Sequence, residues 1–131
     1  DAAIAEIYAE RSFTDGTANR GSLRCRRANW WDFKPVMEFC KERYGSSHGA
    51  HATPSEVAVT WFLHPDAIKH VEMSPKVAPW GRYTDAQSYR AAFPDGRVGS
   101  DPSLADPEDG GKLIALSAAG LIEDFRKFEA A

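Results

Sequence analysis

The sequence contains few cysteines and no long apolar run. Cys25 and Cys40 are the only cysteines in 131 residues, and their spacing fits neither a zinc motif nor a disulfide-rich scaffold. Two reduced, partly buried thiols in a cytoplasmic protein are therefore expected. No stretch approaches the roughly 20 apolar residues that cross a bilayer, so the sequence predicts no membrane partner.

Positive charge does not predominate. Lys and Arg number 16 against 19 Asp and Glu, which gives a net charge of −3. Nucleic acids and anionic membranes select basic surfaces, so neither is expected as a partner. The first six residues lack the basic and apolar regions of a secretory signal, and this agrees with a cytoplasmic location.

Apolar spacing predicts several helices and one strand. Helices are expected over residues 2–11, over residues 36–40 between a capping Asp32 and a closing Gly45, and after Asp106-Pro107. A strand is expected over residues 23–31. Residues 66–105 are predicted to form a long irregular segment, called here the excursion, with a short helix at 84–93. A loop of this length usually binds a substrate or a neighbouring subunit. This order predicts the edge of an α/β layered fold whose other strands lie elsewhere.

The clearest local signal lies in the middle of the chain. Thr53-Pro54-Ser55-Glu56 is a capping box with proline at the first helical position. The helix that follows, ending at Pro65, is apolar on almost all sides and must be covered on most of them. A small, polar loop over residues 45–52 precedes it and carries His48 and His51.

Three interpretations of these polar residues stay open from spacing alone. His48, His51 and Glu56 could supply three metal ligands, although the spacing is no known zinc motif and Glu56 already closes the capping box. They could be ordinary loop polarity. His51 could instead act as a general acid or base. Trp31, next to Trp30 at the end of the predicted strand, could line a pocket or belong to the core.

Two longer motifs resemble the C-terminal half of the creatininase (creatinine amidohydrolase) family. The family pattern H-[AG]-G-x-x-E-T-S, with its apolar helix, stands here as His51-Ala52-Thr53-Pro54-Ser55-Glu56-Val57-Ala58. The family's closing G-x-x-G-D-P-S segment stands as residues 98–110, and Asn29-Trp30-Trp31-Asp32-Phe33 resembles the end of a family strand. The likeness runs from about residue 3 to residue 128, so residues 1–131 are taken as the C-terminal part of one such domain.

The resemblance implies a three-layer α/β/α sandwich and metal-dependent hydrolysis of a C–N bond in a cyclic or small amide. His51 matches the histidine that passes a proton to the leaving nitrogen, and Glu56 matches the motif glutamate. Trp31 matches a tryptophan of the substrate pocket. Ser47 stands where a second pocket tryptophan is found, and with His48 it is assigned to substrate binding.

Departures from the family pattern limit what this chain can do alone. The family's Glu-x-His and N-G-H metal motifs are absent, so a divalent metal, zinc or manganese, is expected to be bound mainly by an N-terminal segment or partner chain. That partner would also complete the sheet, in a homo- or hetero-oligomer, and the isolated chain would fold poorly. The alternative is a non-catalytic subunit that serves in assembly or ligand binding, because Thr53, Val57 and Ala58 replace motif residues.

Overall fold

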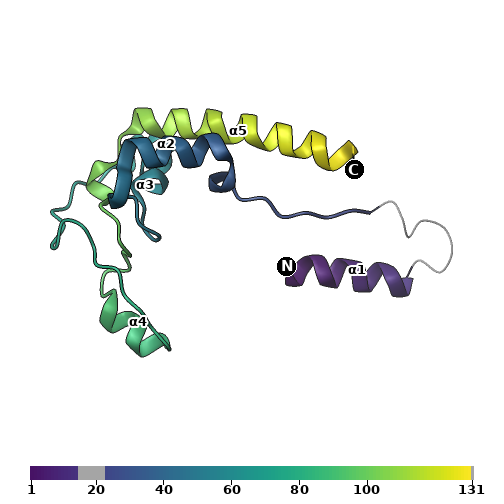
Figure 1. The fold of residues 1–131 in the computed structure, drawn as a ribbon, viewed down its shortest axis with the longest axis horizontal. Coiled ribbons are helices and arrows are strands. Elements are labelled where there is room, and N and C mark those ends of the chain that lie inside the picture. Colours follow the sequence, from purple (N-terminus) through teal and green to yellow (C-terminus); the bar gives the residue numbers. More distant parts are fainter. Residues whose placement is uncertain (15–22, 131) are drawn as a thin grey trace.

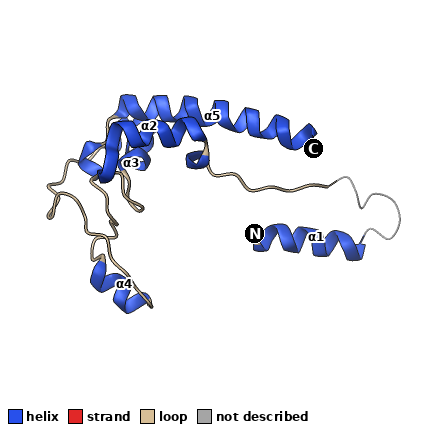
Figure 2. Ribbon diagram, in the orientation of Figure 1, coloured by secondary structure: helices blue, strands red, loops and turns tan. Residues whose placement is uncertain are grey.

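The computed structural model describes residues 1–14 and 23–130. In this part of the chain the regular elements are helices joined by loops and short 3-10 turns (Figure 2). The α-helices are α1 (Ala2–Thr14), α2 (Lys34–Tyr44), α3 (Pro54–Leu63), α4 (Ala86–Ala92) and α5 (Pro107–Ala130). The predicted helices are therefore confirmed, and α2 is longer than its apolar residues alone indicated.

The predicted α/β sandwich is wrong for the described residues. Their one β-pairing is an isolated antiparallel bridge between His51 and Val98, and they form no sheet. The expected strand at 23–31 is an extended segment that ends in a 3-10 turn, Trp30–Asp32. One backbone group of this segment bonds to a side chain and not to a neighbouring strand: the N–H of Cys25 donates to the Tyr8 hydroxyl over 2.9 Å. Alternation of residue types cannot make a strand without a neighbouring strand to pair with.

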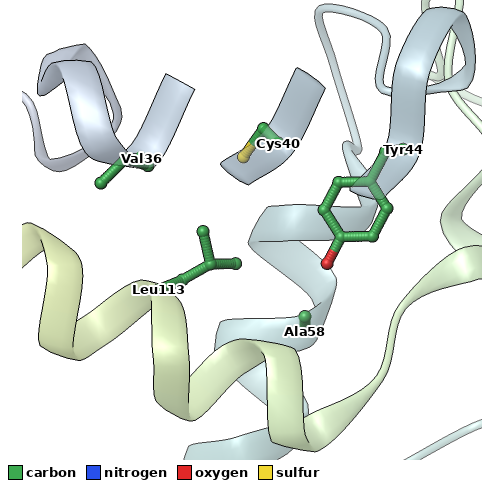
Figure 3. Close-up of a cluster of buried hydrophobic side chains, with 5 residues drawn as sticks. All are labelled: Val36, Cys40, Tyr44, Ala58 and Leu113. Atoms are coloured by element: carbon green, nitrogen blue, oxygen red, sulfur yellow. The ribbon is translucent and has the colours of Figure 1, made fainter. Parts of the chain in front are cut away.

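Three helices meet around a small core (Figure 3). Leu113 of α5 and Val36 of α2 are fully buried, and Ala58 of α3 closes the cluster from the third side. Cys40 and Tyr44 complete it. This core positions the N-terminal end of α3, where the predicted site lies.

Close approach of α3 and α5 depends on a glycine. A Cβ added at Gly110 would lie 2.1 Å from the carbonyl oxygen of Ala58, far inside van der Waals contact. At Gly111 the nearest atom is the ring of Phe62, 2.9 Å away. The backbone of α3 therefore rests directly on α5 at Gly110.

The ends of α2 and α3 follow local chemistry. The capping box of α3 is present, with the Thr53 hydroxyl accepting from the Glu56 N–H and the Glu56 carboxylate accepting from the Thr53 N–H. Gly45 ends α2 with a φ of 54°, a conformation that favours glycine. The expected cap at Asp32 is wrong: Phe33 occupies that position, and Asp32 accepts from the Asn29 side chain instead.

The N-terminal region forms an arm away from this core (Figure 1). Residues 23–29 run along the C-terminal half of α5, where Arg26 pairs with Asp124 over 2.7 Å and the Arg24 guanidinium lies 4.9 Å from the Phe128 ring centre. We use "arm" for α1, residues 23–29 and residues 118–130 of α5. Apolar side chains of the arm stay about half exposed. The covering expected for α3 is also incomplete, because Phe62 is 49% exposed.

The total surface is large for the mass. The chain has 9550 Å² of accessible surface at 14.4 kDa, whereas a compact protein of that mass has about 6,800 Å². The excess of about 2,700 Å² is comparable to the surface buried in an obligate protein interface. Among the described residues, Leu121, Ile122 and Phe125 of α5 contribute exposed apolar side chains to this surface.

Candidate functional site

A cavity of about 660 Å³ lies at the N-terminal end of α3. The 3-10 turn at Trp30, the loop over residues 45–52 and Trp80 of the excursion surround it. Four of the five residues predicted for the site line this cavity: Trp31, His48, His51 and Glu56. The fifth, Ser47, is not in the lining, which instead contains its neighbour Ser46.

His48 is the most constrained of these side chains. Its ring stacks on Tyr44 with 5.8 Å between ring centres, and its Nε2 lies 2.8 Å from the Ser55 hydroxyl. Burial lowers the pKa of His48, while the nearby Glu56 carboxylate acts in the opposite direction. Desolvation disfavours the imidazolium, so the ring is neutral at neutral pH.

Behind His48, a set of hydroxyl groups leads to Glu56. The hydroxyls of Ser55 and Thr53 lie 2.9 Å apart, and the Thr53 hydroxyl donates to Glu56 Oε2 over 2.9 Å. Ser55 is 2% exposed and Thr53 6% exposed. All four side chains contribute to the cavity lining, and those of Thr53 and Ser55 are the least exposed.

His51 is held by its backbone and leaves its ring exposed. The carbonyl oxygen of His51 accepts from the Ser100 hydroxyl over 2.6 Å and from the Val98 N–H over 3.3 Å. The next residue, Ala52, has a φ of 51°, which turns the chain sharply into α3. An anchored backbone with an exposed imidazole on the cavity lining is what a proton-transfer group requires.

The loop over residues 45–52 is fastened to the segment before α5. Ala50 N–H donates to the Val98 carbonyl over 2.8 Å, and Asp101 N–H donates to the Ser47 carbonyl over 2.9 Å. A Cβ at Gly49 would lie 2.5 Å from backbone atoms of residues 98 and 100. Ser47 thus contributes its carbonyl oxygen to the loop's anchorage, and the two predicted motifs form one structural unit.

Sequence reasoning missed Trp80 and the two hydroxyls. Trp80 lines the same cavity as Trp31, and its ring packs on Gly99, where a Cβ would lie 2.2 Å from the indole. Trp31 is 48% and Trp80 65% exposed. The signal for Trp80 was an aromatic residue within a long excursion that was expected to bind something. Thr53 and Ser55 carried no signal beyond helix capping.

Trp30 and Trp31 do not lie at the end of a strand, as the sequence predicted. The two residues lie in the 3-10 turn, and their rings meet edge to face with 5.7 Å between centres. Trp30 packs against the core cluster, whereas Trp31 is exposed at the cavity. The turn therefore still divides them between core and cavity.

Neither a metal cluster nor a membrane span is found in the described residues. Across residues 1–14 and 23–130, no group of three or more His, Cys, Asp or Glu side chains is placed to hold a metal ion. His48, His51 and Glu56 share a cavity without forming such a group. No helix in that part of the chain has the length and apolarity needed to cross a bilayer.

Comparison with known proteins identifies a family. No curated protein matches the chain. A family model described as creatinine amidohydrolase matches residues 1–125. The match does not bear out the narrower assignment to a C-terminal half. Because it spans nearly the whole chain, the protein belongs to the creatininase family.

Proposed function

We propose that this chain forms part of a metal-dependent amidohydrolase that cleaves a C–N bond in a cyclic or small amide. Family membership supports hydrolase chemistry with a divalent metal. The observation that carries the proposal is the gathering of Trp31, His48, His51 and Glu56 around one cavity. Trp31 therefore shares one space with three residues that follow it by 17 to 25 positions.

The described residues do not fit the family's metal by themselves. A catalytic zinc site takes three protein ligands, and no such group exists in the part of the chain that the structure describes. We therefore assign the metal ligands, for zinc or manganese, to a further polypeptide segment or a partner chain. The excess surface and the half-exposed apolar residues of the arm support such a covering, in a homo- or hetero-oligomer.

Within this chain, His51 is the group assigned to proton transfer. Its exposed ring at the cavity can give a proton to the departing nitrogen, which must be protonated to leave as an amine. Trp31 and Trp80 supply apolar faces for a planar substrate. Glu56 holds the first turn of α3 through its capping box, and this keeps the His51 loop in place.

The test compares two histidine substitutions in the assembled, metal-loaded protein. Turnover of a panel of cyclic amides and formamides is measured for His51→Ala and for His64→Ala, an exposed histidine at the end of α3 outside the cavity lining. We expect His51→Ala to lower turnover about 10²- to 10⁴-fold, with unchanged metal content, and His64→Ala to leave it intact. Equal turnover in both variants would instead identify a non-catalytic subunit for assembly or ligand binding.

A further inference from the structure

The cavity contains two groups that exchange protons, and buried hydroxyls join them. His48 Nε2 lies 2.8 Å from Ser55 Oγ, Ser55 Oγ lies 2.9 Å from Thr53 Oγ1, and Thr53 Oγ1 lies 2.9 Å from Glu56 Oε2. Each distance is that of a good hydrogen bond. The four side chains form a continuous path along one wall of the cavity, and all four contribute to its lining.

The direction of each bond follows from counting protons. A hydroxyl carries one proton and two lone pairs. Thr53 gives its proton to the Glu56 carboxylate, which can only accept, and it also accepts from the Glu56 N–H. The second lone pair of Thr53 must then receive the Ser55 proton. With that proton used, Ser55 accepts from His48, and its other lone pair can accept from the Cys40 thiol, which also hydrogen-bonds to Ser55.

The same count fixes the tautomer of His48. Nε2 carries the proton and donates to Ser55, so in the neutral ring Nδ1 carries the lone pair. Burial of the ring, which lowers its pKa, is consistent with this neutral state. His48 is thereby prepared as a proton acceptor at Nδ1.

We infer that His48, Ser55, Thr53 and Glu56 form a proton relay between two points of the cavity. A proton taken up at His48 Nδ1 releases the Nε2 proton to Ser55. Ser55 passes its own proton to Thr53, and Thr53 passes its own to Glu56 Oε2. The Nε2–H bond of His48 breaks, an N–H bond forms at Nδ1 and an O–H bond forms at Glu56. The positive charge of the proton taken up from cavity water thus neutralises the carboxylate, and the water is left as hydroxide. Reversing the transfers restores the first state.

The relay rests on the proposed function only for its role in catalysis. The hydrogen-bonded path itself does not require that the protein hydrolyses amides. Amide hydrolysis removes a proton from water and delivers one to the leaving nitrogen, so a proton must move within the site. Thr53 stands where the family pattern has a small residue without a hydroxyl. The relay is therefore a property of this sequence, and His48 becomes a positioning and proton-accepting group alongside His51.

The tautomer of His48 is measured by nuclear magnetic resonance of the full chain labelled with ¹⁵N in its histidine rings. This experiment requires neither substrate nor metal, so it gives an answer whether or not the protein hydrolyses amides. At pH 7.5 we expect His48 to carry its proton on Nε2, with exchange against water slowed by the bond to Ser55. A wild-type ring protonated at Nδ1 instead would overturn the relay.

Ser55→Ala removes the middle of the path and keeps the capping box, since Thr53 and Glu56 are unchanged. Exchange of the Nε2 proton should become about tenfold faster, the change expected from losing one buried hydrogen bond. Thr60→Ala is the matched control, because Thr60 lies on the same helix and its hydroxyl bonds only to the Glu56 carbonyl. An unchanged exchange rate in Ser55→Ala rejects the relay.

Communication along the path is tested at Thr53, for which no direct bond to His48 is found. Thr53→Val deprives Ser55 of its acceptor, so the Ser55 hydroxyl turns towards Nε2 and the ring shifts towards the Nδ1–H form. Thr53→Ser should restore the Nε2–H form. Far-ultraviolet circular dichroism shows whether α3 survives in each variant. A folded Thr53→Val protein with the wild-type tautomer contradicts the relay.

Discussion

The helical core and the arm share one helix and behave differently. Around Leu113, α5 packs against α2 and α3, and the side chain is fully buried. Two turns later, Leu121 is 51% exposed and Phe125 is 58% exposed. The apolar face of α5 is therefore buried near Leu113 and largely exposed near its C-terminal end.

The core is therefore stabilised by contacts within this chain, whereas the arm exposes apolar side chains that a partner could cover. The core holds the cavity, and its contacts are dense enough for glycine to be needed at Gly110. The arm is held in part by polar contacts such as that of exposed Arg26 with partly buried Asp124, and ion pairs near the surface contribute little. The sequence alone predicted poor folding of the isolated chain. Because the core packs within this chain, we expect the core to persist in isolation and the arm to gain its order from a covering surface.

The largest contrast is expected between two leucines of α5. Leu113→Ala removes a fully buried side chain and should lower the free energy of unfolding by about 2–5 kcal/mol. Leu121→Ala should cost below about 1 kcal/mol in the isolated chain, because half of the side chain is already exposed. Urea denaturation followed by circular dichroism measures both. Equal losses would mean that the arm is packed as firmly as the core.

A second pair of substitutions tests how tightly the core is built. Gly110→Ala places a methyl group against the Ala58 carbonyl and should cost about 1–3 kcal/mol by overpacking, despite the better helix propensity of alanine. Gly111→Ala meets only the Phe62 ring, which can move, and should be close to neutral. Thermal unfolding of the two variants gives the comparison. A stabilised Gly110→Ala protein would show that α3 and α5 are not in backbone contact.

The helices α3 and α4 both begin with a capping box, so the effect of removing the cap can be compared between a helix of the core and an exposed helix. Thr53→Ala removes the cap of α3 and should cost about 1 kcal/mol. Asp85→Ala removes the equivalent cap of α4, an exposed helix of seven residues, and should leave global unfolding almost unchanged. Chemical denaturation reports the first effect, and helix content reports the second. A global loss in Asp85→Ala would place α4 within the cooperative core.

The smallest effect expected is a pH dependence of the core. Burial lowers the pKa of His48 in the folded state, so the unfolded chain binds a proton first as the pH falls. His48 therefore contributes stability above pH ~6.5, which declines below that pH by at most about 1.4 kcal/mol per pH unit. His48→Gln, which can still bond to Ser55, should reduce this slope between pH 7.5 and 5.5. If the urea midpoint changes with pH as much in His48→Gln as in the wild type, other titratable groups cause the pH dependence of stability.

Local signals in the sequence predicted local structure well. Thr53 and Glu56 determined the start of α3, and Gly45 determined the end of α2, because caps depend on neighbouring backbone groups. The strand at 23–31 failed because pairing is a long-range property that residue alternation does not contain. The sandwich expected from the family resemblance required strands that the described residues do not form.

The proximity of the candidate site residues could be predicted where they lie close together in the sequence, whereas their roles stay predictions. His48, His51 and Glu56 fall within nine residues, and the loop that carries them brings them to one cavity. Trp80 could not be assigned, since its position depends on contact with Gly99 and on the course of the excursion. The roles of Thr53 and Ser55 depend on hydroxyl directions, which only the three-dimensional arrangement defines.

The excursion is tied at its base by two backbone hydrogen bonds. Ala78 N–H donates to the Ser100 carbonyl over 2.9 Å, and Gly99 N–H donates to the Pro79 carbonyl over 3.2 Å. Buried Arg97 adds bonds to the carbonyls of residues 75 and 76. With its ends joined in this way, the projecting stretch around α4 is a natural place for a fluorophore or an affinity handle (Figure 1). Because Trp80 at the base of this stretch lines the cavity, the label belongs on α4, whose residues are not part of the lining.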